Sequence, residues 1–134
     1  MKVEDIMTRE VITLCEDDTL RDAINSVQRN HIRHIPIVDG KRLIGVVSDR
    51  DIKRATPSLY SGISQEKFNE MISELSLSRV MTRDPFSISS DTSIKEVVQL
   101  MISKKYGALP VVDSGELVGI VTGIDCLRVL ERML

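Results

Sequence analysis

The sequence predicts a mixed α/β (α+β) fold in which two pseudo-symmetric β-α-β-β-α repeats pack as one module. The first observation is an internal repeat: an offset of 74 residues aligns 3–55 with 77–129 without a gap, and 12 of the 53 aligned pairs are identical. The second is that helical and strand-like patterns follow one another in the same order in both copies. The third is the composition, because 42% hydrophobic residues in a chain of 134 are enough to fill a core.

These observations divide the chain into repeat 1 at 1–55, a partly helical connector at 56–76 and repeat 2 at 77–134. One copy of 53 residues would bury too little surface to be robust alone, so we expect the two copies to pack together. The connector has apolar residues at helical spacing, namely Phe68, Met71, Ile72 and Leu75. It is therefore expected to be packed and not to act as a free tether.

Each repeat begins with a short apolar segment that predicts a strand, at 11–14 in the first copy and around Phe86 and Ile88 in the second. A helix is expected next, because apolar residues recur at i, i+3, i+4 and i+7. They are Leu20, Ala23, Ile24 and Val27 in one copy, and Ile94, Val97, Val98 and Met101 in the other. A hydroxyl followed three residues later by a carboxylate predicts a capping box at both helix starts, in Thr19 with Asp22 and Ser93 with Glu96.

Two short β-rich runs follow each helix, at 35–38 and 43–47 in repeat 1 and at 109–112 and 117–121 in repeat 2. A turn signal of Asp, Gly or Ser joins the two runs in each copy, so each pair is expected to form a hairpin. Pro36 and Pro110 lack an amide hydrogen, which predicts positions at a strand start or a sheet edge. A second, shorter helix is expected to begin near Asp51 and Asp125.

Composition and charge argue against several functions. The formal charge of −2 gives no electrostatic basis for gripping a phosphate backbone, and four Tyr and Phe side chains offer few surfaces for stacking bases, so we expect no nucleic-acid partner. No apolar run approaches the roughly 20 residues needed to cross a bilayer, and residues 1–10 are too charged for a signal peptide. We therefore expect no membrane association and a cytoplasmic location.

Cysteine and histidine usage predicts no metal site and no catalytic nucleophile. Cys15 and Cys126 form no CxxC pair and have no nearby histidine, so they are interpreted as small, buried or half-buried hydrophobic residues. His31 and His34 have no counterpart in the second repeat and no cysteine or carboxylate cluster beside them. We expect neither an obligatory cofactor nor a bound metal.

The two copies resemble the tandem cystathionine-beta-synthase (CBS) domain pair, often called a Bateman module. In repeat 1 the resemblance rests on residues 31–39, which contain Pro36 to Asp39, and on 45–51, which run from Gly45 to Asp51. In repeat 2 it rests on 108–113 and 119–125, and the first copy is most similar to the N-terminal part of acetoin utilization proteins. The resemblance implies a non-catalytic regulatory module that binds AMP, ADP, ATP or S-adenosylmethionine in a cleft between the repeats. It also implies a homodimer that signals to an unidentified protein effector.

By the same resemblance, the ligand-binding carboxylates are Asp51 and Asp125. A carboxylate can accept hydrogen bonds from both ribose hydroxyls, and Ser48 or Thr122, three residues earlier, can point at the phosphate or ribose. Arg33 and His34 would contact phosphate, with Arg50 in the same turn. The corresponding positions in repeat 2 are Gly107, Ala108 and Ile124. Because charge-assisted hydrogen bonds are the stronger ones, phosphate-bearing ligands are expected at the Asp51 site.

The family's arrangement further implies that each adenine is contacted from the other repeat. The expected contacts are Met81, Phe86 and Tyr106 for the Asp51 site, and Met7, Ile12 and Ile32 for the Asp125 site. Repeat 2 would then take a less charged adenosyl ligand or none.

Other interpretations remain open at this point. Ser48 with Asp51, and Thr122 with Asp125, also fit simple helix caps. In that case the chain would be a structural dimerisation or interaction module with vestigial pockets. A nucleotide-processing enzyme with Asp51 or His34 as acid or base is a further alternative, but the sequence offers no nucleophile, metal site or paired carboxylates to support it.

Overall fold

The computed structural model describes residues 1–134, apart from the side chain of Leu59, and forms two compact units. Unit 1 comprises residues 1–11, 41–43 and 85–134, and unit 2 comprises residues 12–40 and 44–84. The units depart from the sequence repeats at three places, one of which is the short stretch 41–43 of repeat 1 that belongs to unit 1. Unit 1 includes the first 11 residues of repeat 1, and unit 2 includes residues 77–84 of repeat 2.

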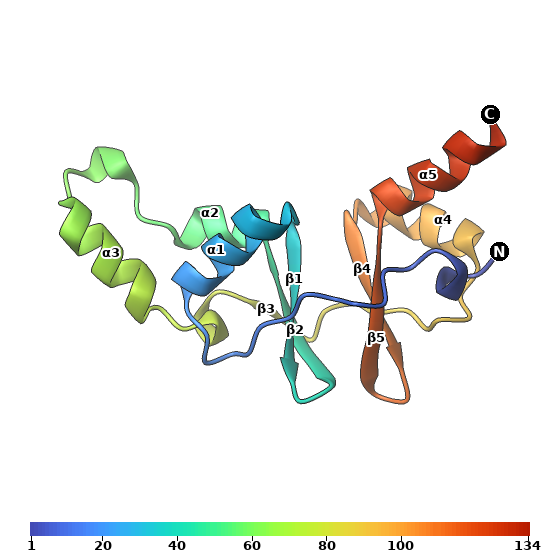
Figure 1. The fold of residues 1–134 in the computed structure, drawn as a ribbon, viewed down its shortest axis with the longest axis horizontal. Coiled ribbons are helices and arrows are strands. Elements are labelled where there is room, and N and C mark those ends of the chain that lie inside the picture. The colour runs from blue at the N-terminus through green and yellow to red at the C-terminus, as the bar shows by residue number, and fades with distance from the viewer. The chain divides into compact units, whose positions relative to one another are not determined.

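Unit 2 is built around α1, which contacts β1, α2 and α3 (Figure 1). In chain order its elements are α1 (Leu20–Asn30), β1 (His34–Asp39), most of β2 (Arg42–Ser48), α2 (Asp49–Ala55), η2 (Leu59–Ser61), α3 (Gln65–Glu74), η3 (Leu77–Arg79) and β3 (Thr82–Arg83). The connector helix α3 is attached to α1 through Arg21, whose Nε donates to the Ser73 hydroxyl at 2.8 Å. Residues 56–76 thus contain η2 and α3, and α3 packs against α1.

Unit 1 contains η1 (Val3–Asp5), α4 (Ile94–Lys104), β4 (Ala108–Asp113), β5 (Glu116–Thr122) and α5 (Gly123–Met133). Strands β4 and β5 are antiparallel, and α5 packs on both β5 and α4 (Figure 1). The tight turn at Ser114 and Gly115 has φ of 52° and 79°, the positive values required by a two-residue hairpin. Among the described residues no helix is long and apolar enough to cross a membrane.

The apolar faces expected for the first helix of each repeat are confirmed. Leu20, Ala23 and Val97 are buried. Ile24 and Val27 pack against the core of unit 2, and Ile94 and Met101 pack against the core of unit 1. Val98 is half-buried. Both halves of the capping box form at Thr19 and Asp22. At Ser93 only one half of the predicted capping box is found among the described residues: the Ser93 hydroxyl accepts a hydrogen bond from the Glu96 amide.

The four strands of the two hairpins each extend one residue beyond the predicted run at both ends. The prediction of a strand at the start of each repeat is wrong. In its place each repeat has a single parallel bridge, between Leu14 and Ile37 in the first and between Ile88 and Val111 in the second. In the first copy a turn begins directly after the bridge, where the Cys15 amide donates to the Asp18 carboxylate at 2.7 Å. That turn redirects the chain toward α1 before a ladder can form.

Each unit has its own hydrophobic core. Each core includes residues from an exchanged segment, which is a segment that the sequence assigns to the other repeat: 77–84 in unit 2 and 1–11 in unit 1. In unit 2 the buried cluster includes Leu77 and Met81, and in unit 1 it includes Val3 and Met7. The remaining buried members are Leu20, Ala23, Ile35, Ile37, Val47, Ile52 and Ile72 in unit 2, and Ile88, Val97, Leu109, Val111 and Val121 in unit 1. The exchanged segments therefore complete both cores.

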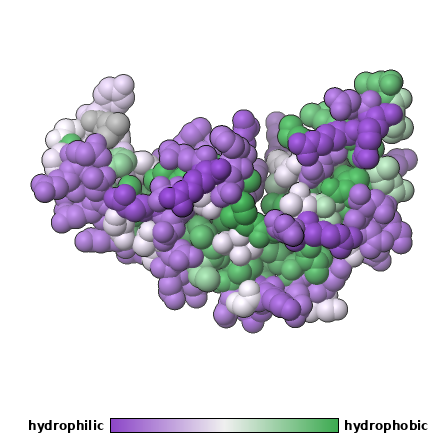
Figure 2. Space-filling view, in the orientation of Figure 1, coloured by the Kyte–Doolittle hydropathy of each residue, from purple (hydrophilic) through white to green (hydrophobic). Residues whose placement is uncertain are grey.

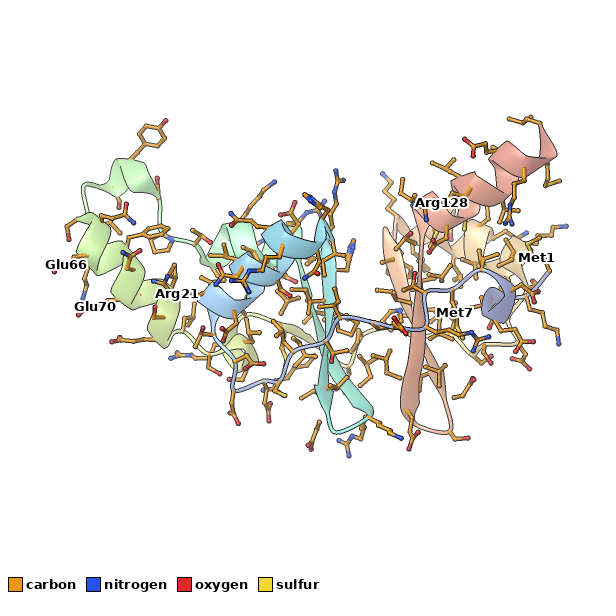
Figure 3. The ribbon with its side chains drawn as sticks, in the orientation of Figure 1. Met1, Met7, Arg21, Glu66, Glu70 and Arg128 are labelled. Atoms are coloured by element: carbon orange, nitrogen blue, oxygen red, sulfur yellow. The ribbon has the colours of Figure 1, made fainter. Side chains whose placement is uncertain are left out.

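Close packing of these segments explains two identities of the repeat. The Met81 side chain and the Thr82 carbonyl lie directly over Gly45, where a Cβ atom would come within 2.7 Å and 3.0 Å of them. In unit 1 Met7 lies over Gly119 beside β5 (Figure 3), and a Cβ there would be 2.6 Å from its sulfur. Any side chain at either glycine would push the Met-Thr segment off its strand.

Replacing Gly119 by alanine should therefore destabilise the fold. Overpacking of a tight core contact costs about 1–3 kcal/mol, and here the Thr8 carbonyl at 2.9 Å cannot move without breaking its pairing with Ile120. Gly123→Ala is the matched control, because a Cβ at Gly123 meets no atom within 4 Å. Urea unfolding of both variants checks this, and equal midpoints for the two would show that the close approach is not structural.

Candidate functional site

The turn between β2 and α2 is held by the hydroxyl and carboxylate that the sequence singles out. Oδ2 of Asp51 accepts hydrogen bonds from the Ser48 amide at 2.8 Å and the Ser48 hydroxyl at 2.9 Å. The Ser48 Oγ in turn accepts from the Asp51 amide at 3.1 Å. The helix-cap interpretation is thus correct as far as one carboxylate oxygen is concerned.

The turn between β5 and α5 repeats this geometry. Oδ2 of Asp125 accepts from the Thr122 amide at 2.8 Å and from the Thr122 hydroxyl at 3.0 Å. The side chain of Asp125 is 10% exposed and that of Asp51 is 14% exposed. Both carboxylates are therefore held in a fixed orientation by their own turn.

The second carboxylate oxygen, Oδ1, has only a loose contact in each turn. Oδ1 of Asp51 lies 4.0 Å from Nη1 of Arg54, and Oδ1 of Asp125 lies 3.7 Å from Nη1 of Arg128. Both arginine side chains are more than 70% exposed, so these ion pairs are weak. Capping and ligand binding are consequently compatible, because Oδ2 serves the turn while Oδ1 can accept from a ligand.

The two arginines were not among the residues expected at the site. Arg54 and Arg128 are identical residues at the repeat offset of 74, which is the signal that would have identified them. They stand one helical turn after the carboxylate in each repeat.

Cations distinguish the two turns. The Asp49 amide at the start of α2 donates to the Arg33 carbonyl at 2.8 Å, which fixes the chain just before β1 beside this turn. The equivalent bond runs from the Gly123 amide to the Gly107 carbonyl at 3.1 Å. The first turn therefore has Arg33 beside it, together with His34 and Arg50, whereas the second has glycine, alanine and isoleucine at those positions.

His34 lies close to both the arginine and the carboxylates of this turn. Burial lowers the pKa of His34 below its ordinary 6.5, Arg33 adds to the effect, and Asp49 and Asp51 oppose it. The imidazole is therefore neutral near pH 7.

A neutral, partly buried His34 predicts a loss of stability in mild acid. Below pH 6.5 His34 takes up a proton in the unfolded chain but stays neutral in the folded one, so protonation favours unfolding. The contribution of neutral His34 to the free energy of unfolding is therefore complete above pH 6.5 and is lost as the pH falls below that value. Urea unfolding at pH 7.5 and pH 5.5 should show a larger drop for the wild type than for His34→Gln. The same pH dependence in both proteins would contradict the assignment.

The residues expected to contact adenine divide between the units. Met81, Ile12 and Ile32 lie in unit 2 with Asp51, and Met7, Phe86 and Tyr106 lie in unit 1 with Asp125. Phe86 and Tyr106 stack on each other, with ring centroids 5.7 Å apart and planes at 17°. The aliphatic pair Ile12 and Ile32 occupies the equivalent positions of the other repeat. The pairing of each carboxylate with adenine contacts from the other repeat stays a prediction.

The two cysteines differ in exposure. Cys126 is half-buried, as expected, whereas Cys15 is exposed, which contradicts the expectation that both are buried or half-buried. Burial raises the pKa of the Cys126 thiol, and Asp125 beside it acts in the same direction, so the thiolate is disfavoured. No group of three or more potential metal ligands gathers among the described residues.

Comparison with known proteins places the repeats in one family. The CBS domain family matches residues 3–58 and 77–132, which covers both repeats. A structure of the acetoin utilization protein AcuB from Vibrio cholerae is 38% identical, covers 99% of this chain and 92% of its own, and has a TM-score of 0.83.

Two further solved structures contain adenosyl compounds. CBSX2 in complex with AMP is 26% identical, with coverage of 98% of this chain and 97% of its own and a TM-score of 0.83. The CBS domain pair of MJ0100, in complex with 5′-methylthioadenosine and S-adenosyl-L-methionine, is 27% identical, with coverage of 100% and 98% and a TM-score of 0.81.

Curated relatives differ in length. The chain spans 92% of a CBS domain-containing protein from Dictyostelium discoideum, which is 33% identical, but only 22–46% of several longer relatives. With both repeats matched and a relative of similar length, the chain belongs to the CBS domain family as a tandem CBS pair.

Proposed function

We propose that the chain is a non-catalytic regulatory module that binds an adenine nucleotide or another adenosyl ligand through Asp51 and Asp125. The observation that carries the proposal is that the two oxygens of each carboxylate have different partners. Oδ2 accepts the hydrogen bonds that hold the turn, and Oδ1 has only a long contact with an exposed arginine. A ribose offers two adjacent hydroxyl donors, which suit an oriented and partly buried acceptor. The AMP, methylthioadenosine and S-adenosylmethionine in related CBS pairs support this class of ligand.

The two turns are proposed to differ in ligand. Arg33, His34 and Arg50 give the Asp51 turn the charge and donors that a phosphate requires, so AMP, ADP or ATP is assigned there. The Asp125 turn has no cation at the equivalent positions, and we assign it a less charged ligand such as S-adenosylmethionine or methylthioadenosine. Adenine is proposed to be contacted by Met81, Phe86 and Tyr106 at the first site, and by Met7, Ile12 and Ile32 at the second.

The signal is proposed to pass through a homodimer to an unidentified protein effector in the cytoplasm. Ligand binding can change the output only by favouring one arrangement of the module over another. No catalytic step is assigned to the chain, and Asp51 and His34 are given binding roles.

Titration calorimetry of the whole chain with AMP, ATP, S-adenosylmethionine and methylthioadenosine tests the proposal. We expect saturable binding of at least one of them, with phosphate-bearing ligands lost selectively in Arg33→Ala. No heat or thermal stabilisation with any of the four would favour the dimerisation module with vestigial pockets. Turnover of a nucleotide would favour the enzyme.

A further inference from the structure

In each repeat an arginine contacts the carboxylate oxygen that is proposed to bind ribose. Nη1 of Arg54 lies 4.0 Å from Oδ1 of Asp51, and Nη1 of Arg128 lies 3.7 Å from Oδ1 of Asp125. Among the described residues no other side chain pairs with either Oδ1, because the hydrogen bonds of both capped turns go to Oδ2. A ligand that uses Oδ1 must therefore compete with the arginine.

Both arginines can leave the carboxylate at little cost. They are exposed, whereas Asp51 and Asp125 are held in place by their own turns and are largely covered. An exposed ion pair contributes little to stability, and the long arginine side chain can rotate while the carboxylate stays fixed. Each site thus combines a fixed acceptor with a movable positive charge.

Arg128 matters most in repeat 2, because glycine, alanine and isoleucine replace the cations of the first turn there. The other cation of α5 is Arg132, one helical turn further from Asp125. Arg132 is exposed and forms none of the ion pairs found among the described side chains. The surface of α5 carries hydrophilic as well as apolar residues (Figure 2). Arg128 is therefore the cation of α5 that lies beside the carboxylate.

The sugar of an adenosyl compound presents its two hydroxyls and its 5′ substituent from the same ring. When the hydroxyls bind Oδ1, the guanidinium loses its partner next to that ring. It gains a new charge-assisted hydrogen bond if the 5′ substituent carries an anion, such as the phosphate of AMP or the carboxylate of S-adenosylmethionine. It gains nothing from adenosine or methylthioadenosine, which have no anionic group.

We propose that Arg54 and Arg128 select ligands with an anionic 5′ substituent by leaving the carboxylate for that anion when the ligand binds. The anion is a phosphate at the Asp51 site and the carboxylate of an amino-acid group at the Asp125 site. This rests on the proposed function and narrows it, because an uncharged adenosyl compound displaces the arginine without compensation. The Asp125 site is accordingly assigned S-adenosylmethionine in preference to methylthioadenosine.

Two pairs of ligands test the exchange by titration calorimetry, each pair differing in the anionic group. AMP and adenosine are compared at the Asp51 site, with Asp125 replaced by asparagine to weaken the other site. S-adenosylhomocysteine and methylthioadenosine are compared at the Asp125 site in the Asp51→Asn protein, because both lack the sulfonium charge of S-adenosylmethionine.

Arg54→Gln should have opposite effects on the two ligands of its pair. We expect AMP to bind about tenfold more weakly, because the bond to phosphate is lost, and adenosine about two- to fivefold more tightly, because the competing ion pair is gone. Arg128→Gln should likewise weaken S-adenosylhomocysteine and strengthen methylthioadenosine. Lys53→Gln and Arg132→Gln are the matched controls, since they remove an exposed cation from the same helices and should leave both preferences unchanged.

The outcomes separate this inference from the function on which it rests. If none of the four ligands binds to the wild-type protein, the proposed function and the exchange are both wrong. If they bind but Arg54→Gln and Arg128→Gln change both ligands of a pair by the same factor, the arginines do not select the anion. If the anionic ligand is weakened and the uncharged one is unaffected, the arginine binds the anion but does not compete for Oδ1, and the exchange is overturned.

Discussion

Asp51→Asn is expected to weaken the binding of AMP by about ten- to a hundredfold without disturbing the turn that holds it. The asparagine carbonyl can still accept from the Ser48 amide, as Oδ2 of Asp51 does at 2.8 Å. Its amide nitrogen then replaces Oδ1 and cannot accept from a ribose hydroxyl. Losing a hydrogen bond to a charged acceptor costs about 1.5–3 kcal/mol, which corresponds to this range of affinity.

The comparison with two other variants separates the roles of the carboxylate. Asp51→Ala removes the cap as well and should lower the free energy of unfolding by about 1 kcal/mol in addition to abolishing AMP binding. Asp49→Asn removes the same charge two residues away, from a side chain that pairs with Lys53 at 3.5 Å. Calorimetry should therefore find AMP affinity lost in Asp51→Asn and retained in Asp49→Asn. Equal affinity in the Asp51→Asn and wild-type proteins would show that Asp51 is only a cap.

Leu77→Ala is expected to destabilise unit 2 by about 2–5 kcal/mol, the usual cost of leaving a cavity in place of a buried leucine. Leu77 is fully buried in the cluster that also contains Leu20 and Ile72, and its amide donates to the Asp18 carbonyl at 2.8 Å. The effect is informative because the sequence assigns Leu77 to repeat 2, whereas its core is built mainly by repeat 1.

Amide hydrogen exchange can locate the damage. Protection in the Leu77→Ala protein should fall most in α1 and β1, which surround the cavity, and less in α4 and β4. Met71→Ala is a suitable control, because Met71 is in the same unit but 42% exposed, and its truncation should change stability by only about 0.5 kcal/mol. Loss of protection confined to residues 85–134 would contradict the exchange of segments between the repeats.

Most of the fold could be predicted because the same local sequence patterns occur in both repeats. The faces of α1 and α4, the two hairpins and the start of α5 each follow from local periodicity or capping that recurs after 74 residues. The first strand of each repeat could not be predicted correctly. A short apolar run indicates that residues are buried, but the turn at Cys15 and Asp18 decides that only Leu14 pairs with its neighbour.

The two capped turns of the candidate site could be predicted from the spacing, but the separate roles of the two oxygens of each carboxylate could not. Spacing indicates that Ser48 lies next to Asp51, and it fits a cap and a ligand contact equally well. In the structure the cap occupies Oδ2, and Oδ1 lies 4.0 Å from Nη1 of Arg54. The placement of Met81 over Gly45 also depends on a contact between residues 36 positions apart, which no local pattern encodes.

A crystal structure of the chain with AMP would show whether Asp51 binds the ribose. We expect the ribose hydroxyls within about 2.5–3.0 Å of Oδ1 of Asp51, the usual range for such bonds, with Oδ2 still bound to the Ser48 amide and Arg54 displaced. The phosphate should lie near Arg33 and His34. If AMP binds with its ribose away from both Asp51 and Asp125, or if Oδ1 of Asp51 keeps its contact with Arg54 in the complex, the carboxylates do not bind ribose and the proposed site is wrong.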